Sequence, residues 1–126
     1  MNKVDVDCVV DSLNLQEIQS LDLENIDEDQ FKAKLRKWRN MNQMFIIFMD
    51  SNQLWSLQQV LETTTKMVDV AIQLAFQYSH QIIQKKYGKP TSPSKKIKNV
   101  MSVLAMGKLG ACELNLSSDI DLILSF

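Results

Sequence analysis

Apolar side chains recur every three or four residues through two long stretches of the chain, the spacing that places them on one face of an α-helix. The first stretch begins at the acidic residues 27–29, whose charges favour a helix N-terminus, and it stops near residues 50–52. Its stripe contains Phe31, Leu35, Trp38, Met41, Phe45 and Phe48. The pattern therefore predicts a helix between these two limits.

A second and longer helix is predicted from about residue 54 to residue 87. Its stripe steps by four and three residues through Leu57, Leu61, Thr64, Val68, Ala71, Ala75, Tyr78 and Ile82. The stripe ends before Gly88 and Pro90, the usual stop signals of a helix. A short connection makes the two helices an antiparallel pair. A short helix is also expected within residues 11–21, capped by Asp11 or Ser12.

The last part of the chain changes to the pattern of β-strands. Residues 100–106 are mostly apolar and predict a strand that is buried on both faces. A tight turn is expected at residues 107–111, and a second strand at residues 120–126. Alternation along this strand places Asp119 and Asp121 on one face, opposite Ile120, Leu122 and Leu124. Helices followed by two strands indicate an α+β fold.

Composition narrows the class of protein. The 126 residues suit one small domain, and 45% apolar residues with only three Gly and two Pro exclude collagen and low-complexity disorder. The net charge of −1 argues against a nucleic-acid binder. No apolar run approaches the roughly 18–20 residues of a membrane span, so no membrane partner is expected. Cys8 and Cys112 lie far apart, which favours reduced thiols and a cytoplasmic location.

Charge divides the chain into segments. Residues 1–29 carry nine acids and one lysine, and form an acidic N-terminal segment that is expected to be solvated. Residues 30–97 form the helical region, which includes a lysine-rich linker around Pro90 and Pro93. Residues 98–126 hold the two strands and the candidate chemistry. The only histidine, His80, is interpreted as a surface or packing residue because no second metal ligand lies near it in the sequence.

The candidate chemistry lies at the end of the chain. Asp119 and Asp121 repel each other on one strand face, and a divalent cation is the simplest reason to tolerate the pair. Mg²⁺ takes one or two carboxylates together with phosphate oxygens, so both residues are predicted as catalytic metal ligands. Phosphate-binding candidates from the turn and the residues before the second strand are Gly107, Lys108, Gly110, Ser117 and Ser118. Together they predict a site for Mg²⁺ and a nucleoside triphosphate.

The motif at residues 106–123, MGKLGACELNLSSDIDLI, resembles the signature of the bifunctional glutamine synthetase adenylyltransferase/adenylyl-removing enzymes. These enzymes contain two nucleotidyltransferase domains, and the sequence of the motif is more similar to the N-terminal, adenylyl-removing copy. Residues 35–39 and 87–90 resemble the upstream helices of the family. Two features depart from the pattern. Ala111 stands where the family usually has glycine, and residues 45–50 are more apolar than the arginine-containing equivalent in the family.

The resemblance implies a polymerase-β-like nucleotidyltransferase fold, of which residues 98–126 would be the beginning. It also implies adenylylation or deadenylylation of a tyrosine on glutamine synthetase, as part of nitrogen regulation, with Mg²⁺ and ATP or ADP. Asp119 and Asp121 match the metal-binding pair of the family. Gly107, Lys108 and Gly110 match the nucleotide-side turn, and Ser118 matches the hydroxyl before the first aspartate.

Such folds take a third carboxylate from a later strand, and the sequence after Asp121 supplies none. We therefore expect a truncated nucleotidyltransferase, a helical layer plus the first two strands, that is inactive alone. Two alternatives stay open. The helical pair with its acidic arm could be a protein-binding module, or the chain could be a degenerate remnant without catalysis.

Overall fold

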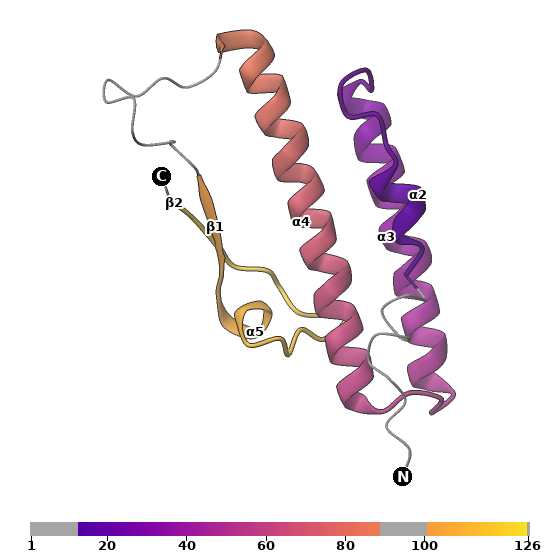
Figure 1. The fold of residues 1–126 in the computed structure, drawn as a ribbon. Coiled ribbons are helices and arrows are strands. Elements are labelled where there is room, and N and C mark those ends of the chain that lie inside the picture. Colours follow the sequence, from indigo (N-terminus) through magenta and orange to yellow (C-terminus); the bar gives the residue numbers. More distant parts are fainter. Residues whose placement is uncertain (1–12, 89–100, 126) are drawn as a thin grey trace.

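The computed structural model describes residues 13–88 and 101–125 (Figure 1). Its elements in chain order are α2 (Leu15–Gln19), α3 (Glu28–Ser51), α4 (Leu57–Tyr87), β1 (Ser102–Ala105), α5 (Gly107–Gly110) and β2 (Leu122–Ser125). This part of the chain is α+β, as predicted. The caps expected at Asp11 or Ser12, most of the lysine-rich linker and the predicted strand ends at residues 100 and 126 lie outside the described residues.

Local capping signals set the limits of the two long helices. Asp27 caps α3, because its side chain accepts a hydrogen bond of 2.8 Å from the Gln30 N–H. Ser56 and Gln59 form a reciprocal capping box at the start of α4. That box explains why α4 begins at Leu57 instead of residue 54. Gly88 ends α4 with φ of 81°, and its N–H donates to the Gln84 carbonyl.

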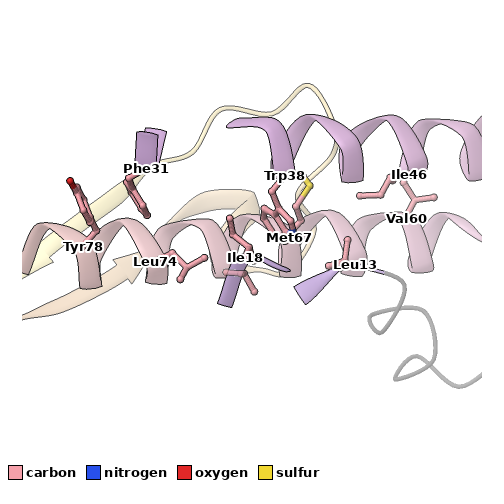
Figure 2. Close-up of a cluster of buried hydrophobic side chains, with 10 residues drawn as sticks. Leu13, Ile18, Phe31, Trp38, Ile46, Val60, Met67, Leu74 and Tyr78 are labelled. Carbon is pink, nitrogen blue, oxygen red and sulfur yellow. The ribbon is translucent and has the colours of Figure 1, made fainter. Parts of the chain in front are cut away.

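The hydrophobic core lies between α3 and α4 and beneath the segment at residues 13–26. In Figure 2, side chains of the two helices point toward one another along their length. The buried members include Phe31, Trp38 and Ile46 of α3 and Val60, Met67, Leu74 and Tyr78 of α4, joined by Leu13 and Ile18. The rings of Phe31 and Tyr78 stack at 4.1 Å, so the start of α3 lies beside the end of α4 and the pair is antiparallel.

Two hydrogen bonds hold the N-terminal segment on the helix pair. The Trp38 indole Nε1–H donates to the Asn14 carbonyl at 2.9 Å, and the Tyr78 hydroxyl donates to the Ile26 carbonyl at 3.3 Å. Each aromatic side chain thus packs in the core and also satisfies a backbone carbonyl. Residues 13–26, which the sequence assigns to a solvated acidic segment, therefore contribute to the core through their apolar side chains.

The buried faces of the helices differ in part from the predicted stripes. Phe31 and Trp38 are buried, but Met41 and Phe48 are 54% and 58% exposed, and Ile46 is buried instead. In α4, the predicted Leu57 is 71% exposed, whereas Val60 is buried. A stripe with frequent three-residue steps rotates around a helix of 3.6 residues per turn, so it leaves the interface toward its ends.

β1 and β2 form a two-stranded antiparallel sheet in which Val103 pairs with Leu124 and Ala105 with Leu122. The prediction that β1 is buried on both faces is wrong. Its residues alternate between exposed and half-buried, and every residue of β2 is exposed. The reason is that α4 covers only one face, across a cavity of about 300 Å³ lined by residues that include Ile72, Phe76, Val103 and Leu124. Within the described ranges, no helix has both the length and the apolar character needed to cross a membrane.

Candidate metal and nucleotide site

The tight turn predicted after β1 is a single helical turn, α5, bounded by two glycines with different roles. Gly107 adopts φ of 56°, a conformation that favours glycine. At Gly110, a Cβ atom would lie 2.5 Å from the Ala105 carbonyl oxygen. The absence of a side chain at Gly110 thus lets α5 fold back against the end of β1.

The segment after α5 is fastened to the helical layer. Leu109 and Leu114 are buried, and the Leu114 N–H donates a hydrogen bond of 3.3 Å to the Thr65 hydroxyl on α4. The Gln43 side chain of α3 reaches the Leu116 carbonyl at 3.5 Å. In Figure 1, the segment between α5 and β2 runs to α4 and returns to the sheet. The candidate site is therefore built on both the sheet and the helices.

Asn115 organises the two serines that precede Asp119. Its side-chain oxygen accepts hydrogen bonds from the Ser117 N–H at 3.2 Å, from the Ser117 hydroxyl at 3.3 Å and from the Ser118 hydroxyl at 2.5 Å. The Lys108 ammonium donates to the Ser118 oxygen at 3.4 Å. Both hydroxyl protons thus point to Asn115, so the serines predicted as phosphate donors shape this loop in the structure.

Asn115 is not among the residues that the sequence pattern predicts for the site. A local signal for it exists, because Asn followed two residues later by Ser is typical of a turn closed by the asparagine side chain. The structure also joins Lys108 to Ser118, two predicted residues that are ten positions apart.

Asp119 and Asp121 lie before β2, which begins at Leu122, so strand alternation does not fix their orientation as predicted. The Asp121 carbonyl accepts a hydrogen bond of 3.0 Å from the Met106 N–H, and this extends the pairing of the strands. The Asp121 carboxylate lies beside Gly107, 3.8 Å from the place that a Cβ would take there. The structure therefore brings Asp121 to the glycine turn, as the predicted site requires.

The two carboxylates are available to a cation. Both residues are exposed, and within residues 13–88 and 101–125 neither side chain takes part in a hydrogen bond or an ion pair. The same ranges contain no cluster of three or more His, Cys, Asp or Glu side chains that could hold a metal. Two carboxylates with open coordination positions fit Mg²⁺, which usually keeps waters and takes phosphate oxygens as further ligands.

The exposed Lys108 contributes a positive charge to this loop through its hydrogen bond to Ser118. His80, by contrast, lies on α4, where its ring stacks on Phe76 and its Nε2 lies 3.2 Å from the Gln84 Nε2. The residues predicted to bind the metal and the nucleotide therefore all lie in the segment from Gly107 to Asp121, and His80 lies outside it.

Comparison with known proteins gives a consistent result. The family described as glutamate-ammonia ligase adenylyltransferase matches residues 11–126. A bifunctional glutamine synthetase adenylyltransferase/adenylyl-removing enzyme from Pseudomonas aeruginosa is 38% identical over 100 residues, which cover 79% of this chain and 10% of the relative. Enzymes of the same name from Neisseria meningitidis serogroup A and Vibrio parahaemolyticus are 37% and 32% identical, over 77% and 79% of this chain and 11% and 10% of the relatives.

The chain thus spans about a tenth of the length of these relatives. No solved structure matches it significantly.

Proposed function

Because the chain belongs to the glutamate-ammonia ligase adenylyltransferase family, we propose that residues 101–125 contribute a Mg²⁺ and nucleotide site to nucleotidyl transfer on glutamine synthetase. The reaction is transfer of the adenylyl group from ATP to a tyrosine, with release of pyrophosphate, or removal of that group from the tyrosine by phosphate, which gives ADP. It serves nitrogen regulation in the cytoplasm. The names of the relatives include both directions, and the sequence of the motif favours the adenylyl-removing one.

In this proposal, Asp119 and Asp121 hold the metal ion, and Lys108 together with the backbone at Gly107 faces the phosphates. Gly110, whose N–H donates to the Met106 carbonyl at 3.2 Å, closes the turn that presents them. Ser117 and Ser118 act mainly by keeping the loop before Asp119 in shape. When bound, Mg²⁺ would neutralise charge on the phosphate oxygens at the transferring group. The single observation that carries the proposal is that the exposed Asp121 carboxylate lies beside the turn at Gly107, with the exposed Asp119 two positions before it, and that neither carboxylate has a partner among the described residues.

The proposed domain organisation follows the same division. Residues 1–29 are the acidic N-terminal segment, residues 30–97 the helical region, and residues 98–126 the start of a polymerase-β-like nucleotidyltransferase sheet. The described residues offer two carboxylates at the site and no third ligand side chain. We therefore propose that this polypeptide binds the metal weakly and does not turn over adenylylated glutamine synthetase by itself.

The test is a titration with Mn²⁺, a paramagnetic substitute for Mg²⁺, with and without ADP. In the wild-type chain, we expect amide NMR signals around residues 107–121 to broaden first. Asp121→Asn should weaken binding about tenfold, because the cation loses one of two charged ligands. The matched control is Glu113→Gln, an exposed acid of the same segment, which should bind like the wild type. Equal binding by Asp121→Asn and the wild type would contradict the proposal.

A second candidate function, protein binding by the helical region, is favoured by one observation. The second half of α3 and the residues that follow expose a group of large apolar side chains, Met41, Met44, Ile47, Phe48, Leu54 and Leu57. Such a patch is unusual on a free surface. Binding through it would be independent of metal and unchanged in Asp121→Asn, so the same variant separates the two functions.

A further inference from the structure

Three consecutive threonines on α4 are buried, but only one of them bonds outside its own helix. Thr64 donates to the Val60 carbonyl within α4 at 2.7 Å. The Thr63 hydroxyl has no hydrogen-bond partner among the described residues. The Thr65 hydroxyl accepts the N–H of Leu114, which lies 49 positions later in the chain. Thr65 is thus the polar link between α4 and the segment that leads to the carboxylates.

A continuous series of hydrogen bonds runs from Thr65 toward Asp119. Thr65 holds Leu114, and the next residue, Asn115, accepts from both serine hydroxyls through its side chain. The Asn115 backbone carbonyl also accepts the Ser118 N–H at 3.1 Å. Ser118 immediately precedes Asp119. The backbone that leads to Asp119 is therefore anchored on α4, with a further bond from Gln43 of α3 to the Leu116 carbonyl, whereas Asp121 is held by its backbone pairing with Met106 at the sheet.

Removing the Thr65 acceptor would leave the buried Leu114 N–H without a partner. An unpaired buried N–H is costly, so the segment would move to regain solvent or another acceptor. Such a movement would displace Asp119 relative to Asp121, since the sheet holds only the latter. Two ligands that chelate one ion are sensitive to their separation, because metal–oxygen distances are fixed within narrow limits.

We propose that Thr65 is a positioning residue that sets the metal affinity of the Asp119 and Asp121 pair from the helical layer. The inference rests on the proposed function of that pair. It adds that α4 helps to position the metal ligands, in addition to covering one face of the sheet.

The test compares valine substitutions at two neighbouring buried threonines. Valine has nearly the shape of threonine but lacks the hydroxyl, so both Thr65→Val and Thr63→Val should fold. Thr65→Val is expected to weaken Mn²⁺ binding about threefold to tenfold, a typical effect of residues that act on a site without touching its ligand. Thr63→Val should bind like the wild type, because its hydroxyl has no hydrogen-bond partner to lose among the residues that the structure describes. Thr65→Ser keeps the acceptor and should restore affinity.

Equal Mn²⁺ affinity of Thr65→Val and Thr63→Val would overturn the proposal, even if Thr65→Val had lost stability. If Thr65→Val failed to fold, Asn115→Ala would replace it. This variant breaks the same series at an exposed residue, and wild-type affinity in it would also overturn the proposal.

Amide hydrogen exchange in the metal-free chain separates this inference from the proposed function. Thr65→Val should accelerate exchange across residues 114–121, whereas Thr63→Val should not. If the wild type binds no Mn²⁺ through Asp121, the proposed function fails, and the exchange rates still decide whether Thr65 positions the loop. Acceleration confined to Leu114 would show that it does not.

Discussion

Gly107 and Gly110 bound the same helical turn but tolerate a side chain to different degrees. At Gly110, alanine would place its Cβ 2.5 Å from the Ala105 carbonyl oxygen, and backbone atoms cannot move aside as a flexible side chain can. We expect Gly110→Ala to destabilise the sheet by about 1–3 kcal/mol, the usual cost of overpacking. Urea unfolding followed through the amide signals of β1 and β2 measures this.

Gly107→Ala is the control for that prediction. Its nearest neighbour would be the Asp121 carboxylate at 3.8 Å, so only the conformational cost of φ at 56° remains, about 1 kcal/mol. Equal losses in the two variants would mean that the close approach to Ala105 is not what requires glycine.

Asp69 gives a prediction about pH. It lies half-buried on α4, and burial raises the pKa of its carboxyl group above 3.8, an effect that the positive charge of Lys66 partly offsets. Above pH 3.8 the unfolded chain releases this proton first, so the folded state is destabilised as pH rises to the folded pKa and stays so beyond it. Asp69→Asn should therefore have a higher Tm than the wild type at pH 7 and the same Tm near pH 3.

Thermal unfolding of both proteins between pH 3 and pH 7 measures that difference. A Tm difference that stays constant over this range would show that the substitution acts through packing and not through the charge of Asp69.

The elements of the fold follow from local sequence to different degrees. Both long helices were predictable, because caps such as Asp27 and Gly88 act within one turn of the chain. The start of α4 was also encoded locally, in the Ser56 and Gln59 capping box, but the apolar Leu54 suggested an earlier start. The buried faces were predictable only in part, since they depend on how two rotating stripes meet.

The exposure of the sheet and the contacts that support the candidate site could not be predicted from local sequence patterns. An apolar strand looks the same whether two layers cover it or one, so the exposure of β2 could not be read from its composition. The candidate residues of the Gly107 to Asp121 segment were found from their chemistry. The contacts that hold these residues in place could not be predicted. The hydrogen bond between Thr65 and Leu114 joins positions far apart in the chain, and no periodicity encodes such a contact.

In the molecule as a whole, the described apolar core is concentrated between the helices. Most members of the main buried cluster belong to α3 and α4, and Leu13 and Ile18 come from the segment laid over them (Figure 2). The sheet is joined to this unit through the buried Leu114, the Thr65 hydrogen bond and a cavity-containing contact with α4. Stability is therefore expected to be unevenly distributed, with the helical unit more stable than the sheet.

Truncation of one apolar side chain in each unit tests this distribution. Ile46 is 0% exposed, so Ile46→Ala removes buried area and leaves a cavity, and it should lower the free energy of unfolding by about 2–5 kcal/mol. Leu124 is 59% exposed, so Leu124→Ala should change it by only about 0.5 kcal/mol. Ile47→Ala, at the adjacent and 43% exposed isoleucine of α3, controls for helix propensity. Urea denaturation followed by the fluorescence of Trp38 and Trp55, which both pack in or against the core of the helices, reports the helical unit. A large loss in Leu124→Ala would instead show that the sheet and the helices unfold as one cooperative unit, because a defect in the sheet would then be transmitted to Trp38.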